Sequence, residues 1–266
     1  PFRISTGPAL PISVRRASSR ARTGSATGRL LGWLKQGAYR WAYGAQSAGR
    51  KALCTAAAIT VLAAPAAWAD ETVIAALGDS LTQGFGLPPE EGFVPQLEAW
   101  LSARGHNVRL INAGVSGDTT AGGLSRIGWT LTDEVDGVIV ALGGNDLLRG
   151  IAPEVARSNL TGVMEAAADA GTDVLLVGLE APGNYGPDYK AAFEAIYPEL
   201  AAEFGALLHE NFLGPLSGAE GGGAELGAVM QPDGIHPNAR GVKLIVQDIG
   251  PAVERLIDRI EGAEAG

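Results

Sequence analysis

Short apolar runs alternate with segments of helical periodicity from residue 72 to the end of the chain. Five runs have the length and composition of buried strands: residues 72–77, 108–111, 137–142, 173–179 and 206–208. Helices are predicted over 92–103, near Leu124, and over 153–170, 188–204 and 237–261. Because this alternation is typical of βαβ units, we expect an α/β fold with a parallel sheet of about five strands and helices on both faces. In such a sheet, the chemistry is expected beyond the carboxyl ends of the strands.

The charge of the chain is divided unevenly between two parts. Residues 1–69 hold ten basic residues and no acidic one, which leaves ten basic and all 29 acidic residues, a formal charge of −19, in residues 70–266. Residues 52–64 form a weakly apolar run of thirteen residues behind Arg50 and Lys51, and Ala67-Trp68-Ala69 resembles an A-x-A cleavage site. We therefore expect 1–69 to be an export leader cleaved after Ala69, and the protein to be periplasmic or secreted.

Two other interpretations of the leader stay open, an uncleaved membrane anchor and an organellar transit peptide. The apolar run is shorter than the roughly twenty residues that span a bilayer, which favours export and no stable membrane insertion after cleavage. Residues 70–266 would then form a single domain without cysteine, since Cys54 lies in the leader. An acidic domain of this kind is not expected to bind nucleic acid, because phosphate neutralisation needs a basic surface. One cysteine also excludes a Cys-based zinc cluster.

The sequence GDSLT follows the first predicted strand. A serine in a tight Gly-Asp-Ser turn can present its hydroxyl above the sheet while its backbone N–H points to the same space. The structural alternative is that Asp79 or Ser80 only caps the next helix. The Gly-x-Ser-x-Gly nucleophile elbow is missing, which disfavours the α/β-hydrolase fold. Ser80 is therefore a candidate nucleophile.

The second and third strands are followed by NAGVSGDTT and ALGGNDLLRG. Gly117 has no side chain, so its N–H can approach an oxyanion closely, and the amide of Asn145 is a neutral donor suited to the same task. The structural alternatives are a left-handed turn with a helix cap at Asp118 or Thr119, and a strand-ending turn at Asn145 and Asp146. Neither a G-x-G-x-x-G turn nor a Walker lysine is present, so a nucleotide site is disfavoured.

The last cluster, DGIHPN, precedes the C-terminal helix. Asp233 and His236 are three residues apart across a glycine, so one turn can bring the carboxylate to the imidazole. The carboxylate would hold Nδ1–H and leave Nε2 to accept a proton from a serine. Pro237 is expected to begin the helix. We expect structural roles for the other two histidines, His106 and His209.

Together, GDSLT, SGDTT, GGNDLLRG and DGIHPN resemble the SGNH (GDSL) hydrolase family over essentially all of residues 72–260. The segment APGNYGPDYKAAFEAIYPELAAEFG is similar to the bacterial periplasmic group of arylesterases, acyl-CoA thioesterase I and lysophospholipase L1. The resemblance implies a flavodoxin-like three-layer α/β/α sandwich without metal or cofactor. It also implies a Ser80–His236–Asp233 triad and an oxyanion hole formed by Ser80, Gly117 and Asn145.

The expected substrate is a small-molecule ester or thioester, including a lysophospholipid. Five residues are candidates to line an acyl pocket, with ordinary packing as the alternative for each: Leu81, Phe85, Leu87, Leu147 and Tyr185. Three other functions stay open. They are a carbohydrate O-acetylesterase with the same triad, a non-catalytic binding protein on this scaffold, and a phosphate- or nucleotide-binding flavodoxin-like module.

Overall fold

The sheet is built around β1 (Thr72–Gly78), in which all seven residues are buried in the computed structural model, which describes residues 71–221 and 227–264. The other strands are β2 (Val108–Gly114), β3 (Gly137–Ala141), β4 (Asp173–Val177) and β5 (Leu207–His209). All pairs are parallel, and the spatial order is β2-β1-β3-β4-β5. This is the flavodoxin-like order, and it confirms the predicted five-stranded parallel sheet. Its direction of growth reverses at β1, which places a ligand-binding crevice beyond the ends of β1 and β3.

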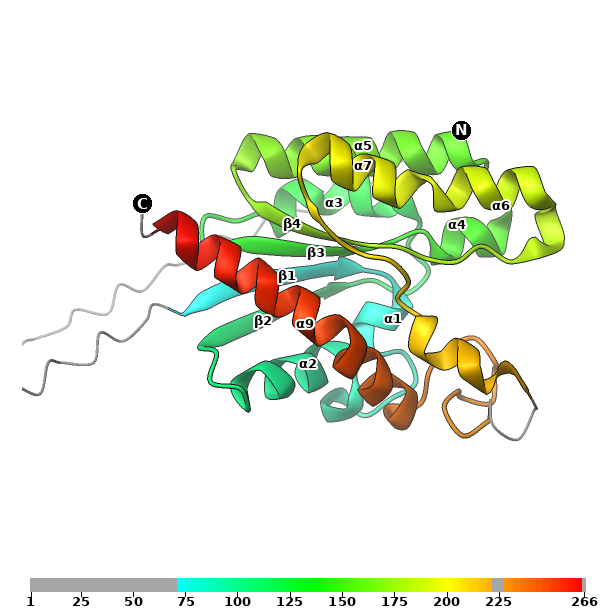
Figure 1. The fold of residues 1–266 in the computed structure, drawn as a ribbon, viewed down its shortest axis with the longest axis horizontal. Helices are drawn as coiled ribbons and strands as arrows, with labels where there is room; N and C mark the ends of the chain where they lie inside the picture. The colour runs from blue at the N-terminus through cyan, green and yellow to red at the C-terminus, as the bar shows by residue number, and fades with distance from the viewer. Residues whose placement is uncertain (1–70, 222–226, 265–266) are drawn as a thin grey trace, which may run out of the picture. The chain divides into compact units, whose positions relative to one another are not determined.

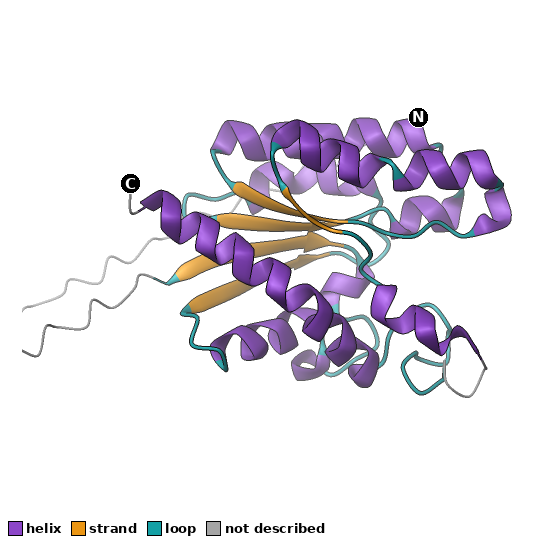
Figure 2. Ribbon diagram, viewed as in Figure 1, coloured by secondary structure: helices purple, strands orange, loops and turns teal. Residues whose placement is uncertain are grey.

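Helices cover both faces of the sheet, so the domain has three layers (Figures 1 and 2). One layer holds α2 (Phe93–Ser102) and α9 (Ala239–Glu264), which pack against each other and against the sheet. The other layer holds α3 (Thr120–Thr130), α5 (Pro153–Ala170) and α7 (Ile196–Phe204). Shorter elements lie in the connections: α1 (Ser80–Gln83), η1 (Pro89–Glu91), α4 (Gly144–Arg149), η2 (Gly183–Tyr185), α6 (Pro187–Glu194) and η3 (Gly214–Gly221).

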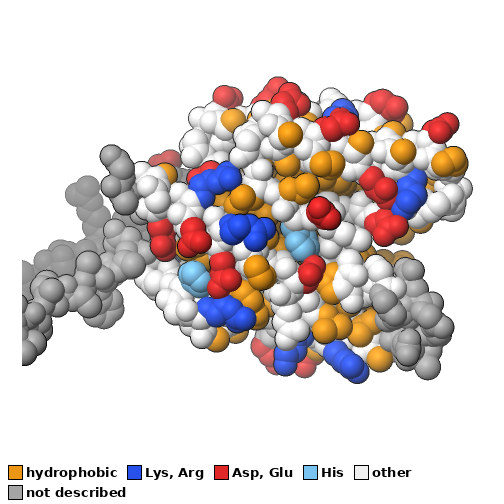
Figure 3. Space-filling model, in the orientation of Figure 1, with side chains coloured by type: hydrophobic (Ala, Val, Ile, Leu, Met, Phe, Trp, Pro, Cys, Tyr) orange, Lys and Arg blue, Asp and Glu red, His pale blue; other side chains and the backbone are white. Residues whose placement is uncertain are grey.

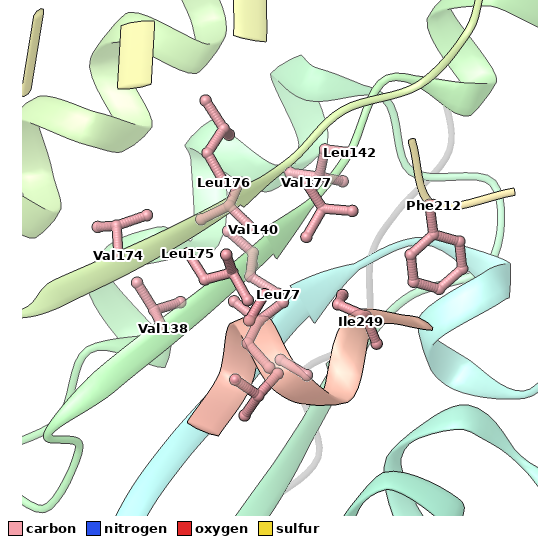
Figure 4. Packing of buried hydrophobic residues seen from close by; sticks show 14 of the residues in the cluster. Leu77, Val138, Val140, Leu142, Val174, Leu175, Leu176, Val177, Phe212 and Ile249 are labelled. Atoms are coloured by element: carbon pink, nitrogen blue, oxygen red, sulfur yellow. The ribbon is translucent and has the colours of Figure 1, made fainter. Parts of the chain in front are cut away.

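The core lies between the sheet and these helices. Leu77 of β1, Val140 of β3 and Leu175 of β4 are fully buried, and Ile249 of α9 packs over the same cluster (Figure 4). Strands covered on both faces read as continuous apolar runs, which is why these segments could be recognised in the sequence. Each such side chain contributes about 1.5–3 kcal/mol when removed from water.

The structure corrects two predicted helix boundaries. The segment 188–204 forms two helices that meet at Ala195. Pro198 explains the break, because it has no N–H to donate to the carbonyl of Glu194. The last helix begins at Ala239 and not at Pro237, which pairs with Met230 in an isolated bridge. The N-terminus of α9 is capped by Asn238, whose Oδ1 accepts from the N–H groups of Arg240 and Gly241.

One face of the described domain can be inspected for a basic binding surface (Figure 3). On the side shown in Figure 3, basic side chains lie among acidic ones and form no continuous patch. Within residues 71–221 and 227–264, none of the helices combines the length and the apolar character needed to cross a membrane. The predicted leader, residues 1–69, lies outside the described residues.

Candidate active site

The residues proposed from the sequence gather where the sheet order reverses. Ser80 begins α1 directly after β1, Gly117 lies in the loop after β2, and Asn145 lies in α4 after β3. The loop before α9 brings His236 to Ser80, although the two are 156 residues apart. The parallel sheet is what allows this, because the carboxyl ends of neighbouring strands meet at one edge.

Ser80, His236 and Asp233 form one hydrogen-bonded chain. His236 Nε2 is 2.9 Å from Ser80 Oγ, and His236 Nδ1 is 2.6 Å from Asp233 Oδ2. Since a carboxylate accepts, Nδ1 carries the proton and Nε2 is free to accept from the serine hydroxyl. The imidazole is largely shielded, at 14% exposure of its side chain, whereas the Asp233 side chain is 37% exposed.

The turn at Asp233 holds the carboxylate in its ionised form. Its Oδ1 accepts from the N–H groups of Ile235 and His236, both at 3.0 Å. These bonds, with the bond from the His236 side chain as the largest contribution, lower the pKa of Asp233 to about 2. The sequence reasoning therefore identified a local unit, in which a three-residue spacing suffices to join the carboxylate to the imidazole.

Two anchors fix this unit relative to Ser80. Asn238 caps α9 immediately after Pro237, so the loop ends on a rigid helix. The amide of Gln231 donates to the carbonyl of Phe85 at 2.7 Å and to that of Pro237 at 3.0 Å. Gln231 thus connects the histidine loop to the segment that follows α1. The sequence offered no signal for this connection.

Asp79 is the helix cap that the sequence offered as the alternative for this turn, and it also makes a bond to Asn145 that the sequence did not predict. Its Oδ1 caps α1 by accepting from the N–H of Leu81 at 3.0 Å, while its Oδ2 accepts from Asn145 Nδ2 at 3.1 Å. The carboxyl group is 3% exposed, and this burial raises its pKa against the opposing effect of the hydrogen bonds. Asp79 therefore connects the Asn145 amide to the turn that carries Ser80, and this bond uses one of the two N–H groups of the amide.

The loop after β2 is held closely against α1, the short helix that Ser80 begins. A Cβ at Gly114 would lie 2.3 Å from the backbone nitrogen of Gln83, so this close approach requires glycine. Ser116 Oγ donates to Gln83 Oε1 in the same contact. Gly117 has a φ of +83°, a conformation that side chains disfavour. Thr119 caps α3, as the structural alternative proposed.

The five candidate pocket residues separate by exposure. Leu147 is 7% exposed and belongs to the core, and Leu81 and Leu87 are partly buried against it. Phe85 and Tyr185 are 49% and 41% exposed, and the ring of Phe85 lies 4.7 Å from that of His236. Three further exposed apolar residues, which sequence reasoning did not name, lie within three positions of a candidate site residue in the sequence: Val115, Leu148 and Ile235. The signal in the sequence that could have identified them was an apolar residue close to a predicted site residue.

The remaining titratable candidates make other contacts. Asp146 is fully buried and accepts from the N–H and hydroxyl of Thr120, at 2.9 and 2.6 Å, so its carboxylate is not the partner of His236. Nε2 of His106 is 3.2 Å from Glu254. Among the described residues, no three or more His, Cys, Asp or Glu side chains are grouped to hold a metal ion.

Comparison with known proteins is consistent with this arrangement. The sequence profile of the GDSL-like Lipase/Acylhydrolase family matches residues 76–244, a range that contains all the residues of the hydrogen-bonded chain. Esterase TesA of Pseudomonas aeruginosa is 37% identical over 182 residues, which are 68% of this chain and 87% of that protein. Thioesterase 1/protease 1/lysophospholipase L1 of Escherichia coli (strain K12) is 33% identical over 207 residues, 75% and 91% of the two chains. The crystal structure of AlinE4, an SGNH-hydrolase family esterase, is 43% identical, with a TM-score of 0.57 over 70% of this chain and 96% of AlinE4.

Proposed function

Because this chain belongs to the GDSL-like lipase/acylhydrolase family, we propose that it is a serine hydrolase that cleaves carboxylic esters or thioesters through an acyl-enzyme on Ser80. The observation that carries the proposal is the continuous hydrogen-bonded chain from Ser80 Oγ through His236 to Asp233. A serine hydroxyl is a weak nucleophile at neutral pH, and an adjacent base that is oriented by a carboxylate activates it.

The reaction proceeds by acyl transfer to the serine and then to water. As Ser80 Oγ attacks the carbonyl carbon, its proton passes to His236 Nε2, and the ionised Asp233 stabilises the imidazolium. The tetrahedral intermediate collapses when His236 returns this proton to the leaving alcohol or thiol, which departs as the acyl-enzyme forms. Water then gives a proton to His236 and attacks the acyl carbon, and the acid leaves as Ser80 recovers its proton.

The proposed oxyanion hole consists of the N–H groups of Ser80 and Gly117 and the amide of Asn145. Two features support it. Asp79 holds the Asn145 amide through a 3.1 Å hydrogen bond, so the donor is oriented before substrate binds. Gly117 has a positive φ and no side chain that would keep a ligand away from its N–H. Removing one such donor typically costs about 10²–10³ in rate.

An exposed aromatic side chain against the proposed base favours a substrate with a sizeable acyl chain. Phe85 is 49% exposed and packs on the His236 ring. An apolar surface at this place suits an alkyl or aryl chain better than an acetyl group on a carbohydrate. Long-chain thioesters and lysophospholipids are therefore the proposed substrate class, and the carbohydrate O-acetylesterase is the second candidate.

A chain-length series tests both candidates. The wild-type protein should hydrolyse p-nitrophenyl octanoate faster than the acetate in kcat/KM, and should also cleave an acyl thioester and a lysophospholipid. Activity confined to the acetate would reject the proposed substrate class. The Ser80→Ala variant should lose activity on every substrate, and unchanged hydrolysis by this variant would favour a non-catalytic binding protein with a contaminating esterase.

We further propose that residues 1–69 are an export leader and that residues 70–266 are the mature domain. The support is compositional: an acid-free basic segment, a short apolar run and the small residues that end at Ala69. N-terminal sequencing of the protein recovered from the periplasm or the medium should begin at Asp70. Recovery of the intact chain in the membrane fraction would indicate an uncleaved anchor.

A further inference from the structure

The loop that carries Gly117 is attached to its surroundings on three sides. On the nucleophile side, Ser116 bonds to Gln83 of α1. On the sheet side, the side chain of Arg126 donates to Asp118 at 2.6 Å, to the carbonyl of Ala113 at 2.6 Å and to that of Gly78 at 2.7 Å. These contacts attach the loop to β1, β2 and α1.

The third attachment joins the loop to α4, the helix that carries Asn145. Arg149 Nη2 donates to the carbonyl of Gly117 at 2.8 Å. Asp146, next to Asn145, accepts from both the N–H and the hydroxyl of Thr120, where the loop enters α3. The short helix is therefore bonded to the loop at Gly117 itself and at the end of the loop. The two proposed oxyanion donors that come from different strand ends are linked through these bonds.

Arg149 differs from the buried members of this network. It is exposed, as are its neighbours Leu148 and Gly150, and no carboxylate among the described residues forms an ion pair with it. Six of the other basic residues of the domain do form such ion pairs. Its guanidinium donates to the loop, at the carbonyl of Gly117. The guanidinium of Arg149 is therefore bonded to the loop that carries Gly117 and, among the described residues, not to a surface carboxylate.

We propose that Arg149 is a positioning residue that holds Gly117 at a fixed spacing from the Asn145 amide, so that the two donors act on the same oxyanion. This inference rests on the proposed hydrolase function. Arg149 acts through the backbone of Gly117 and does not touch the substrate. Its loss should therefore weaken transition-state stabilisation and leave ground-state binding largely unchanged.

The test compares Arg149→Met with the wild-type full chain and with Arg255→Met. Arg255 is a matched control, because it is also exposed and its guanidinium also donates to a backbone carbonyl, that of Pro251, at 3.1 Å. It lies in α9 on the order of 24 Å along the helix from Ala239, since each residue adds about 1.5 Å. Arg149→Lys is the conservative variant, because an ammonium can still donate to the Gly117 carbonyl.

With p-nitrophenyl octanoate, Arg149→Met should lower kcat about 5- to 30-fold, which is less than the effect of deleting a donor outright, and leave KM within about twofold. Inhibition by octylboronic acid, which forms a tetrahedral adduct on the serine, should weaken in parallel. Inhibition by 1-octanol, which has the same alkyl chain and no anionic oxygen, should stay unchanged. Arg149→Lys should recover part of kcat, and Arg255→Met should match the wild type.

Four results would overturn the proposal: a wild-type kcat in Arg149→Met, an equal loss in Arg255→Met, a folded Arg149→Lys that recovers no kcat, or a loss confined to KM for acyl-CoA. The last result would mean that the guanidinium binds the anionic leaving group directly. If Arg149→Met is inactive and also has a lower Tm, the decision rests on Arg149→Lys. A folded Arg149→Lys that recovers no kcat contradicts the proposal. An active wild type beside an inactive Ser80→Ala upholds the hydrolase function whichever result is found for Arg149.

Discussion

Replacing Asn145 by alanine should reduce activity and stability together, because the amide has partners of two kinds. One N–H of the amide donates to the buried Asp79 carboxylate at 3.1 Å, and the other is available to the oxyanion. Loss of an oxyanion donor costs about 10²–10³ in kcat, or roughly 3–4 kcal/mol. Loss of a hydrogen bond to a buried carboxylate costs about 1–3 kcal/mol of unfolding free energy. For a domain of this size, the second effect lowers Tm by about 2–4 °C per kcal/mol.

Asn159→Ala is the matched control for this variant. Its amide donates to the Thr120 hydroxyl at 3.0 Å, within the network that holds α3 and α4, and it is not among the proposed oxyanion donors. Steady-state kinetics on p-nitrophenyl esters and thermal unfolding by circular dichroism measure the two effects separately. Asn159→Ala should lose stability while kcat stays within severalfold of the wild type. A loss of less than tenfold in kcat for Asn145→Ala would refute the assignment of its amide to the oxyanion hole.

Three further predictions concern pH and packing. Burial lowers the pKa of His209, so as the pH falls the unfolded chain binds a proton at this histidine before the folded chain does. The free energy of unfolding should therefore fall as the pH drops below about 6.5. Urea titrations over this pH range should show a weaker decline for His209→Asn. The pKa of Asp233 is about 2, so its carboxylate stays ionised through the working pH range. Asp233→Asn should lower kcat by about 10²–10⁴-fold at every pH above 5, because an asparagine amide favours the tautomer of His236 whose Nε2 carries the proton and cannot accept one from Ser80. Gly143→Ala should destabilise the domain by at least about 2 kcal/mol in thermal or urea unfolding, since φ is +123° and a Cβ would lie 2.3 Å from the buried hydroxyl of Tyr197. Gly171→Ala is the control, because φ is +69° and the space around it is open, and it should cost about 1 kcal/mol.

The parts of the site that the sequence predicted well are local in the chain. Asp233 and His236 are three residues apart, and a single turn joins them, so their spacing alone indicated the contact. Asp79 directly precedes Ser80, and its capping of α1 followed from residue type. The central strands β1 and β3 were recognised because they are buried on both faces and are therefore apolar throughout.

The parts that could not be predicted depend on contacts between distant segments. Asn145 and Asp79 are 66 residues apart, and nothing near either residue indicates their bond. The same holds for Arg149 and Gly117, which are 32 residues apart, and for Gln231 and Phe85, 146 apart. Asn145 was expected in a turn or as a donor, and it lies in the short helix α4, which carries no apolar period long enough to detect.

The sequence by itself determined the succession of strands and helices along the chain, the parallel sheet and the identity of the residues at the strand ends. Periodicity, residue type and short spacings encode these features directly. The tertiary structure decided how the strand ends face one another. The β2-β1-β3 order brings three loops to one edge, and buried polar contacts such as Asp79 with Asn145 and Asp146 with Thr120 set their spacing. Such contacts are specified only when the chain is folded, since a buried polar group must find its partner wherever the packing places it.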